Sequence, residues 1–224
     1  MSAPRGELAV AIPSGRVLLE GILDLPKEVS GVVAFSHGSG SGRHSPRNRF
    51  VAHELQAAGL GTLLLDLLTP EEDLDYEMRF DIALLTERLA DAVRFLRKQA
   101  PTRALPIGLF GASTGAASAL RVAAAMPGDV AAVVSRGGRP DLAGNEALAA
   151  VTAPTLLIVG GRDIEVIELN QAAYDRMRCT KELKIVPGAT HLFEEPGTLE
   201  QVASHAVRWF AQHAAGGAER AGVS

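Results

Sequence analysis

The sequence predicts an α/β protein in which helices cover both faces of an open, mostly parallel sheet. Short apolar runs alternate along the chain with longer segments that have helical periodicity. Most of the runs lack polar alternation, which is typical of strands buried on both faces of a parallel sheet. Polar residues suited to catalysis directly follow several of these runs. Because the carboxyl ends of parallel strands share one edge of a sheet, we expect these residues to converge there.

The expected elements follow one another with few interruptions. Two opening strands, at 7–12 and 16–25, flank a turn at Pro13-Ser14-Gly15. The buried strands that follow are expected at 32–35, 62–65, 107–110, 130–134, 155–159 and 183–186. The helical segments between them are 49–58, 78–99, 114–125 and 167–177. We expect one domain over residues 1–224, with a flexible tail at about 214–224.

Composition narrows the class of protein. The chain has 224 residues, 47% of them hydrophobic, with 22 Lys and Arg against 26 Asp and Glu and a net charge of −4. No basic run would follow a phosphate backbone, so we expect no nucleic-acid partner. No apolar stretch reaches the ~20 residues of a membrane helix or forms a secretory leader. With Cys179 as its only cysteine, the chain is expected to be cytoplasmic. We also expect a monomer or homodimer.

The segment Gly111-Ala112-Ser113-Thr114-Gly115 carries the clearest chemical signal. It matches G-x-S-x-G between a strand-like run and a helical segment. In that context a sharp turn lifts the serine hydroxyl above the sheet, and the two glycines relieve crowding. The motif predicts that Ser113 is a nucleophile.

Two further residues complete a possible triad. Asp163 directly follows the run at 155–159, and His191 lies just beyond the last strand. The order Ser, Asp, His is typical of one class of serine hydrolases. Considered alone, His191 could be a surface-loop histidine and Asp163 a helix cap. In combination with Ser113, a catalytic triad is the stronger interpretation.

The glycine-rich run His37-Gly38-Ser39-Gly40-Ser41-Gly42 predicts an oxyanion hole. Acyl transfer places negative charge on a carbonyl oxygen, and backbone N–H groups must already face that position. We expect one donor from Thr114, directly after the nucleophile, and one from Ser39. His37 is a further candidate for contact with substrate.

Together these motifs resemble the α/β-hydrolases, in particular the small dienelactone-hydrolase-like group. The similarity rests on His37-Gly38, the elbow around Ser113, Gly161-Arg162-Asp163 and Gly188-Ala189-Thr190-His191. It implies an eight-stranded sheet whose second strand is antiparallel, with nucleophile, acid and base at Ser113, Asp163 and His191. Dienelactone hydrolases proper use cysteine as nucleophile, so the resemblance predicts the fold and the triad rather than a lactone substrate. Residues 65–72 also resemble hydrolase modules that are sometimes fused to phosphoribosyltransferases, and we expect no such domain within these 224 residues.

Other interpretations are weaker. The glycine-rich loop could bind a dinucleotide with Asp66 on the ribose, but Arg43 stands where the third glycine of G-x-G-x-x-G would be. The histidines lack zinc-like spacing, so neither a metal nor another cofactor is expected. Arg136 and Arg139 follow a strand at the catalytic edge; one could bind a substrate carboxylate or phosphate, or both could be solvated or internally paired. Asp66 and Asp141 are reserve candidates for the acid.

The spacing between 134 and 155 leaves no room for a large lid. We therefore expect a serine esterase that cleaves small carboxylic esters through an acyl-enzyme. A thioesterase or lactonase would use the same residues. A ligand-binding module without turnover is the alternative from another class.

Overall fold

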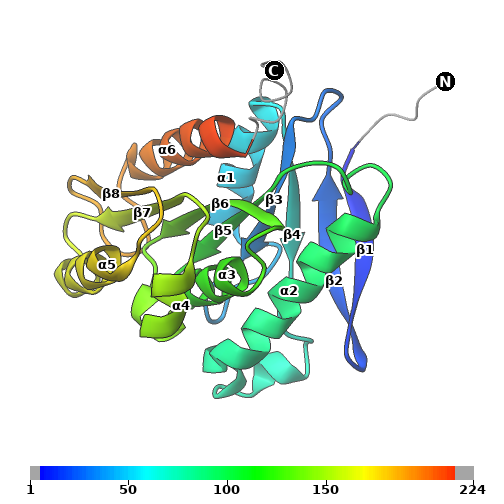
Figure 1. Cartoon of the computed structure of the whole chain (residues 1–224), viewed down its shortest axis with the longest axis horizontal. Helices are drawn as coiled ribbons and strands as arrows, with labels where there is room; N and C mark the ends of the chain where they lie inside the picture. Colours follow the sequence, from blue (N-terminus) through cyan, green and yellow to red (C-terminus); the bar gives the residue numbers. More distant parts are fainter. Residues whose placement is uncertain (1–5, 215–224) are drawn as a thin grey trace.

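The computed structural model describes residues 6–214, and a single eight-stranded sheet runs through them (Figure 1). The strands are β1 (Leu8–Ser14), β2 (Val17–Asp24), β3 (Gly31–Ser36), β4 (Leu60–Leu65), β5 (Ile107–Ala112), β6 (Val130–Arg136), β7 (Thr155–Gly160) and β8 (Lys181–Val186). Their order is β1-β2-β4-β3-β5-β6-β7-β8. β2 pairs antiparallel with both β1 and β4, and all other neighbours are parallel. This confirms the expected α/β-hydrolase sheet.

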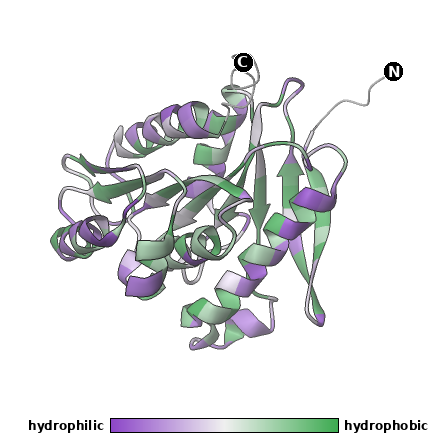
Figure 2. Ribbon diagram, viewed as in Figure 1, coloured by the Kyte–Doolittle hydropathy of each residue, from purple (hydrophilic) through white to green (hydrophobic). Residues whose placement is uncertain are grey.

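Helices form a layer on each side of the sheet (Figure 1). They are α1 (Pro46–Ala57), α2 (Ile82–Lys98), α3 (Thr114–Ala125), α4 (Asn145–Ala150), α5 (Ile164–Arg176) and α6 (Thr198–His213), with short 3-10 turns η1 (Glu72–Leu74), η2 (Met78–Phe80) and η3 (Pro140–Ala143). One apolar core lies between the sheet and α2, α3, α4 and α5, and a second lies between the sheet and α1 and α6. Figure 2 shows mostly hydrophobic strands, a largely hydrophobic α3, and helices α5 and α6 in which hydrophilic and hydrophobic residues alternate.

Some boundaries differ from the sequence predictions. The helix expected at 78–99 begins only at Ile82, because the Asp81 carboxylate accepts a hydrogen bond from the Leu84 N–H at 3.0 Å and caps it there. Met78–Phe80 forms a separate 3-10 turn instead. The first turn of the chain is also shifted: Pro13 and Ser14 belong to edge strand β1, and Gly15 takes the positive φ of 57° that the hairpin needs.

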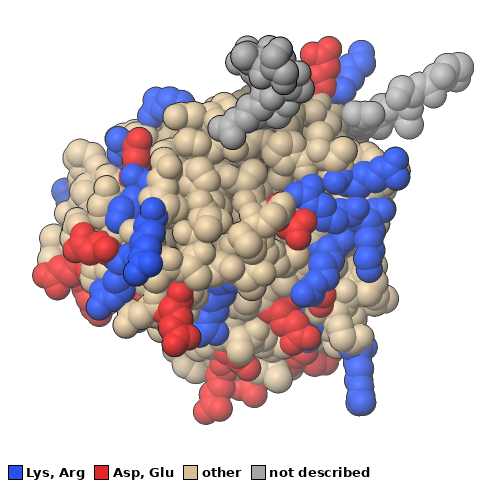
Figure 3. Space-filling model, viewed as in Figure 1, with Lys and Arg blue, Asp and Glu red and all other residues tan. Residues whose placement is uncertain are grey.

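The surface and the ends add three points. On the face seen in Figure 3, charged side chains of both signs lie mostly around the periphery. No helix within residues 6–214 is both long and apolar enough to cross a membrane. The tail expected at 214–224 lies outside the described residues except for Ala214, which is buried.

Candidate active site

Ser113 lies in a sharp turn between β5 and α3. Its backbone has φ 51° and ψ −122°, a conformation that non-glycine residues rarely adopt. The turn leaves no space for side chains at the flanking glycines: a Cβ on Gly111 would lie 2.5 Å from Ala116 Cα, and one on Gly115 would lie 2.2 Å from the Ser36 carbonyl oxygen. The G-x-S-x-G pattern is therefore required by close packing of β5, α3 and β3.

His191 lies between Ser113 and Asp163. Its Nδ1 is 2.6 Å from Asp163 Oδ2, and its Nε2 is 3.3 Å from Ser113 Oγ. The ionised carboxylate can only accept, so Nδ1 carries the proton and Nε2 is left to accept from the serine hydroxyl. Asp163 precedes the first residue of α5 but makes no side-chain capping bond there, so its carboxylate is free to bind the imidazole.

The loop that carries His191 is held by its own contacts. Phe193 takes a positive φ of 55° and packs its ring into the core beneath α6. The backbone N–H of Thr190 donates to the Glu195 carboxylate at 3.0 Å, and hydrogen bonding to Thr190 lowers the pKa of Glu195. These contacts fix the imidazole beside Ser113.

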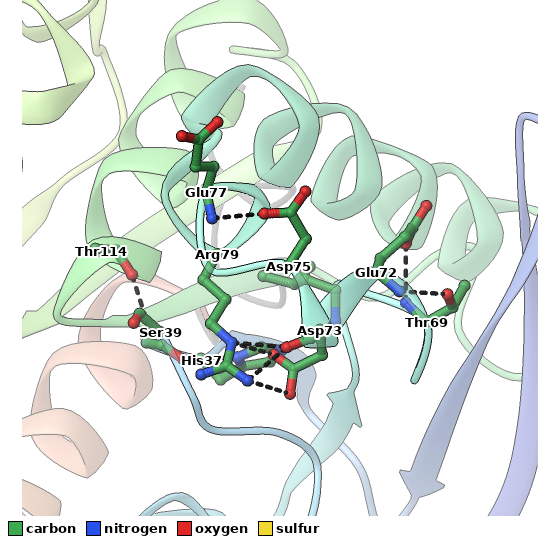
Figure 4. A network of polar contacts seen from close by, with 11 residues as sticks. His37, Ser39, Thr69, Glu72, Asp73, Asp75, Glu77, Arg79 and Thr114 are labelled. Atoms are coloured by element: carbon green, nitrogen blue, oxygen red, sulfur yellow. Dashed lines mark hydrogen bonds and ion pairs between the residues drawn. The ribbon is translucent and has the colours of Figure 1, made fainter.

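The glycine-rich loop after β3 covers Ser113. A Cβ on Gly38 would lie 3.0 Å from Ser113 Cβ, so the loop backbone passes directly over the serine. The Ser39 N–H donates to Thr114 Oγ1 at 3.1 Å, and Figure 4 shows the two residues facing one another. The two residues expected to supply the oxyanion donors are thus neighbours in space, although one of the two N–H groups already has an acceptor.

His37 anchors this loop. Its Nδ1 donates to the Gly38 carbonyl and its Nε2 accepts from the Leu67 N–H, both at 2.9 Å. Burial lowers the pKa of His37, which favours this neutral form. Because both ring nitrogens are bonded to backbone, His37 positions the loop. Its contact with substrate stays a prediction, and the residue lines the cleft described below.

A second loop lies beside His37 (Figure 4). Its Arg79 guanidinium donates to the backbone carbonyl of Asp73, with Nε 2.9 Å from that oxygen, and forms an ion pair with the Asp73 carboxylate. Glu72 accepts from the Thr69 N–H at 2.9 Å and so closes the first turn of the loop. Sequence patterns drew attention only to residues 65–72 of this region, and they did not predict the contacts between Asp73 and Arg79.

The two candidate arginines have different environments. Arg139 forms a two-pronged pair with Asp141, at 2.9 and 2.8 Å, and this hydrogen bonding raises its pKa. Arg136 is buried, and its Nη2 donates to Asn48 Oδ1 at 3.3 Å. Burial, together with the nearby positive charge of Arg47, lowers the pKa of Arg136 to about 10.

The reserve acids are already paired. Asp141 is bound to Arg139, and Asp66 accepts from the Arg43 backbone N–H at 2.6 Å and forms an ion pair with its guanidinium. Cys179 lies next to Thr155, at the start of β7 and therefore away from the edge that carries Ser113, and burial raises its pKa. No cluster of three or more metal-ligating side chains occurs among residues 6–214.

A cleft of about 500 Å³ lies beside the glycine-rich loop. Its walls include Ser39, His44, Arg47, Thr69 and Asp73. This volume falls within the range of small-molecule sites, about 300–1,000 Å³. The cleft therefore has the size of a small ligand and meets the glycine-rich loop at Ser39, while Ser113, Asp163 and His191 are not among its walls.

The chain belongs to the dienelactone hydrolase family, whose model matches residues 72–214. The crystal structure of a dienelactone hydrolase from Anabaena variabilis is similar, with a TM-score of 0.91 and 52% identity over 94% of this chain and 99% of that one. Est1E from Butyrivibrio proteoclasticus shares the fold at a TM-score of 0.78 and 18% identity, over 91% of this chain and 98% of that one.

Two relatives carry names of other kinds. A Mycobacterium tuberculosis protein provisionally named a phosphoribosyl transferase is 55% identical over 213 residues, which are 95% of this chain and 48% of that protein. The chain thus spans about half the length of this relative. A Bradyrhizobium protein provisionally named a 2-oxo-3-(5-oxofuran-2-ylidene)propanoate lactonase is 30% identical over 166 residues, covering 65% of this chain and 66% of that one.

Proposed function

We propose that the protein is a serine hydrolase that cleaves small carboxylic esters through an acyl-enzyme. The observation that carries the proposal is the position of His191, which bridges Ser113 Oγ at 3.3 Å and Asp163 at 2.6 Å. A serine in a strained strand-to-helix turn, a base within reach and an acid that orients the base are the parts that activated-serine chemistry needs.

In the proposed reaction, Ser113 Oγ attacks the ester carbonyl while His191 Nε2 takes its proton. Asp163 holds the imidazole in the required tautomer and stabilises the imidazolium that forms. His191 then protonates the leaving alcohol, which departs and leaves an acyl-enzyme. Water attacks this intermediate with His191 as base, and Ser113 is regenerated.

The oxyanion would be bound by the N–H groups of Thr114 and Ser39. Thr114 is the first residue of α3, so its N–H is one of the free donors at a helix start. The Ser39 N–H now donates to Thr114 Oγ1, and we propose that it exchanges this acceptor for the substrate oxygen.

The substrate class follows from the surroundings of the site. Among the described residues only η3 and α4 lie between β6 and β7, so no large lid covers the site. An open cleft of about 500 Å³ suits short, water-soluble acyl groups better than long lipids. Lactones are the second candidate, because the Bradyrhizobium relative is named a lactonase and ring opening would use the same three residues.

The remaining expectations stay part of the proposal. They are a single domain, a cytoplasmic location, a monomer or homodimer, and turnover without a cofactor. The Mycobacterium relative is provisionally named a phosphoribosyl transferase, and the matched residues make up 48% of that longer protein. We propose that this chain corresponds to a hydrolase portion of such an architecture.

Replacement of Ser113 tests the proposal. Ser113→Ala should lower kcat for short p-nitrophenyl esters by about 10⁴-fold or more, with circular dichroism and Tm close to wild type. A series of acyl-thioesters and lactones, run with the same pair of proteins, ranks the substrate classes. Wild-type rates in Ser113→Ala would refute the assignment of the nucleophile.

A further inference from the structure

Arg136 is a buried cation without a carboxylate partner among the described residues. The residue is 8% exposed, and within residues 6–214 its one side-chain hydrogen bond goes to the neutral Asn48 amide at 3.3 Å. Its Nη1 is buried and finds no acceptor in residues 6–214. Burial without a compensating anion is the main cause of its lowered pKa.

Another arginine shows how the fold ordinarily buries such a group. Arg88 is 6% exposed, and its Nη2 lies 2.8 Å from the Glu72 carboxylate. Its Nη1, like that of Arg136, is buried without an acceptor, so the difference between the two arginines is the carboxylate. At Arg136 the neighbouring charge is instead that of the Arg47 guanidinium, which also lowers the pKa of Arg136. The Nε of Arg47 is also buried without an acceptor. Both arginines thus have an unsatisfied buried donor, but Arg47 pairs with Glu194 whereas Arg136 has no anion, and an unpaired buried cation disfavours the folded state.

Three observations connect this pair with the proposed active site. The Arg136 carbonyl accepts the Ser113 N–H at 3.2 Å, so the arginine and the nucleophile are bonded neighbours on adjacent strand ends. Asn48 and Arg47 lie in the first turn of α1, and Arg47 lines the cleft. Arg47 Nη1 also lies 3.2 Å from the Glu194 carboxylate, three residues after His191.

We propose that Arg136, Arg47 and Asn48 form an anion-binding subsite that holds a carboxylate or phosphate group of the substrate beside Ser113. The subsite rests on the proposed function, since it gives that reaction its substrate class. A planar guanidinium with free donors suits two-pronged binding of either group. Glu194 is 64% exposed and bound to Arg47, and it is the carboxylate that an incoming substrate anion would replace.

The subsite has a consequence for stability that does not depend on turnover. Arg136→Met removes the unpaired buried charge and keeps much of the side-chain volume, so it should raise Tm in phosphate-free buffer. A clear fall in Tm would make Arg136 a structural residue and contradict the proposal. Arg139→Met is the matched control: it breaks the pair with Asp141 on the same loop, and it should not raise Tm.

Binding is tested in the Ser113→Ala background, with glutarate and inorganic phosphate as separate probes. We expect at least one of the two to raise Tm and to bind in calorimetry. Addition of Arg136→Met should abolish both signals, and addition of Arg139→Met should retain them. Absence of binding by both anions, or binding that survives Arg136→Met, overturns the subsite.

Kinetics then separate a substrate group from a free anion. The single variant Arg136→Met, which keeps Ser113, is compared with the wild-type protein. Its kcat/KM should fall about tenfold or more for an ester whose acyl chain ends in a carboxylate, and less than about threefold for the neutral ester of equal length. An equal fall for both esters would contradict a role in substrate recognition. If no ester is hydrolysed by the wild-type protein, the proposed function fails, and the Tm and calorimetric results still decide whether the anion subsite exists.

Discussion

Asp163 stands at the position where a carboxylate commonly caps a helix, yet its side chain binds His191 instead. The Nδ1–Oδ2 distance is 2.6 Å, and α5 begins without a side-chain cap at Asp163. Helix formation and site geometry therefore place different demands on this residue. The absence of the capping bond is what frees the carboxylate to fix the tautomer of the imidazole.

Replacement of this acid has a specific expected effect. Asp163→Asn should keep the fold but offer the imidazole an amide, which allows the wrong tautomer, and kcat should fall by about 10³–10⁴-fold. Asp141→Asn is the control, because that carboxylate is bound to Arg139. The test compares initial rates of the two variants on one short ester. A larger loss of kcat in Asp141→Asn would indicate that Asp141, and not Asp163, is the acid of the triad.

The limits of sequence reasoning are clear at two arginines near the end of β6. Arg136 is the last residue of β6, Arg139 lies three residues further along the chain, and both carry the same chemistry. Only the fold shows that the chain turns Arg139 toward Asp141 and Arg136 toward α1. Strand alternation could have placed Arg136 on the same face as Val134. That no carboxylate lies beside Arg136 depends on residues far away in the sequence.

Among the elements, the loop between β3 and α1 is held from both ends. His37 fixes its start through two backbone hydrogen bonds, and Ser45 Oγ accepts the Asn48 N–H at 3.4 Å where α1 begins. The middle of the loop rests on Ser113 through Gly38. This support is what a preorganised oxyanion donor requires.

A pair of substitutions separates the backbone of this loop from its side chain. Ser39→Ala keeps the N–H and should change kcat only mildly. Ser39→Pro removes the N–H and should lower kcat by about 10²–10³-fold. The comparison is made at saturating ester, with Tm measured for both proteins. Equal activity of the two variants, with both folded, would take Ser39 out of the oxyanion hole.

The elements also show which boundaries sequence could predict. The strands leading into Ser113 and Asp163 were expected almost to the residue, because continuous apolar runs between turns are a strong pattern. The start of α2 was placed four residues too early, since Met78–Phe80 continues the apolar periodicity and only the Asp81 cap ends it. A helix was expected somewhere between residues 134 and 155, but α4 has no pattern long enough to predict its bounds.

For the molecule as a whole, topology brings the site together. The strands β5, β7 and β8 run parallel in one half of the sheet, and they are followed by Ser113, Asp163 and His191. Residues 50 and 28 positions apart thus reach one edge. Strand order and the family match confirm this architecture, which the sequence predicted from the order of its apolar runs.

Folding stability should depend on pH through buried histidine. Burial lowers the pKa of His37 below its ordinary value of 6.5, so the unfolded chain binds the proton more readily. The stabilisation is complete above about pH 6.5 and is lost as pH falls toward the lowered pKa. Urea unfolding between pH 7.5 and 5 should therefore show a falling free energy of unfolding.

The slope can be assigned by substitution. His37→Gln should flatten it, while His53→Gln, an exposed position on α1, should not. A smaller slope should remain, because partial burial also lowers the pKa of His205 and His213. An unchanged slope in His37→Gln would contradict a buried neutral imidazole.

The most direct measurement of the central claim is reaction of the intact protein with a fluorophosphonate, followed by peptide mapping. Among 12 serines, only one held by a base in an activating geometry should react at neutral pH. We predict a single adduct, on Ser113, that is lost in His191→Ala. An unlabelled protein, or an adduct on another serine, would contradict the account.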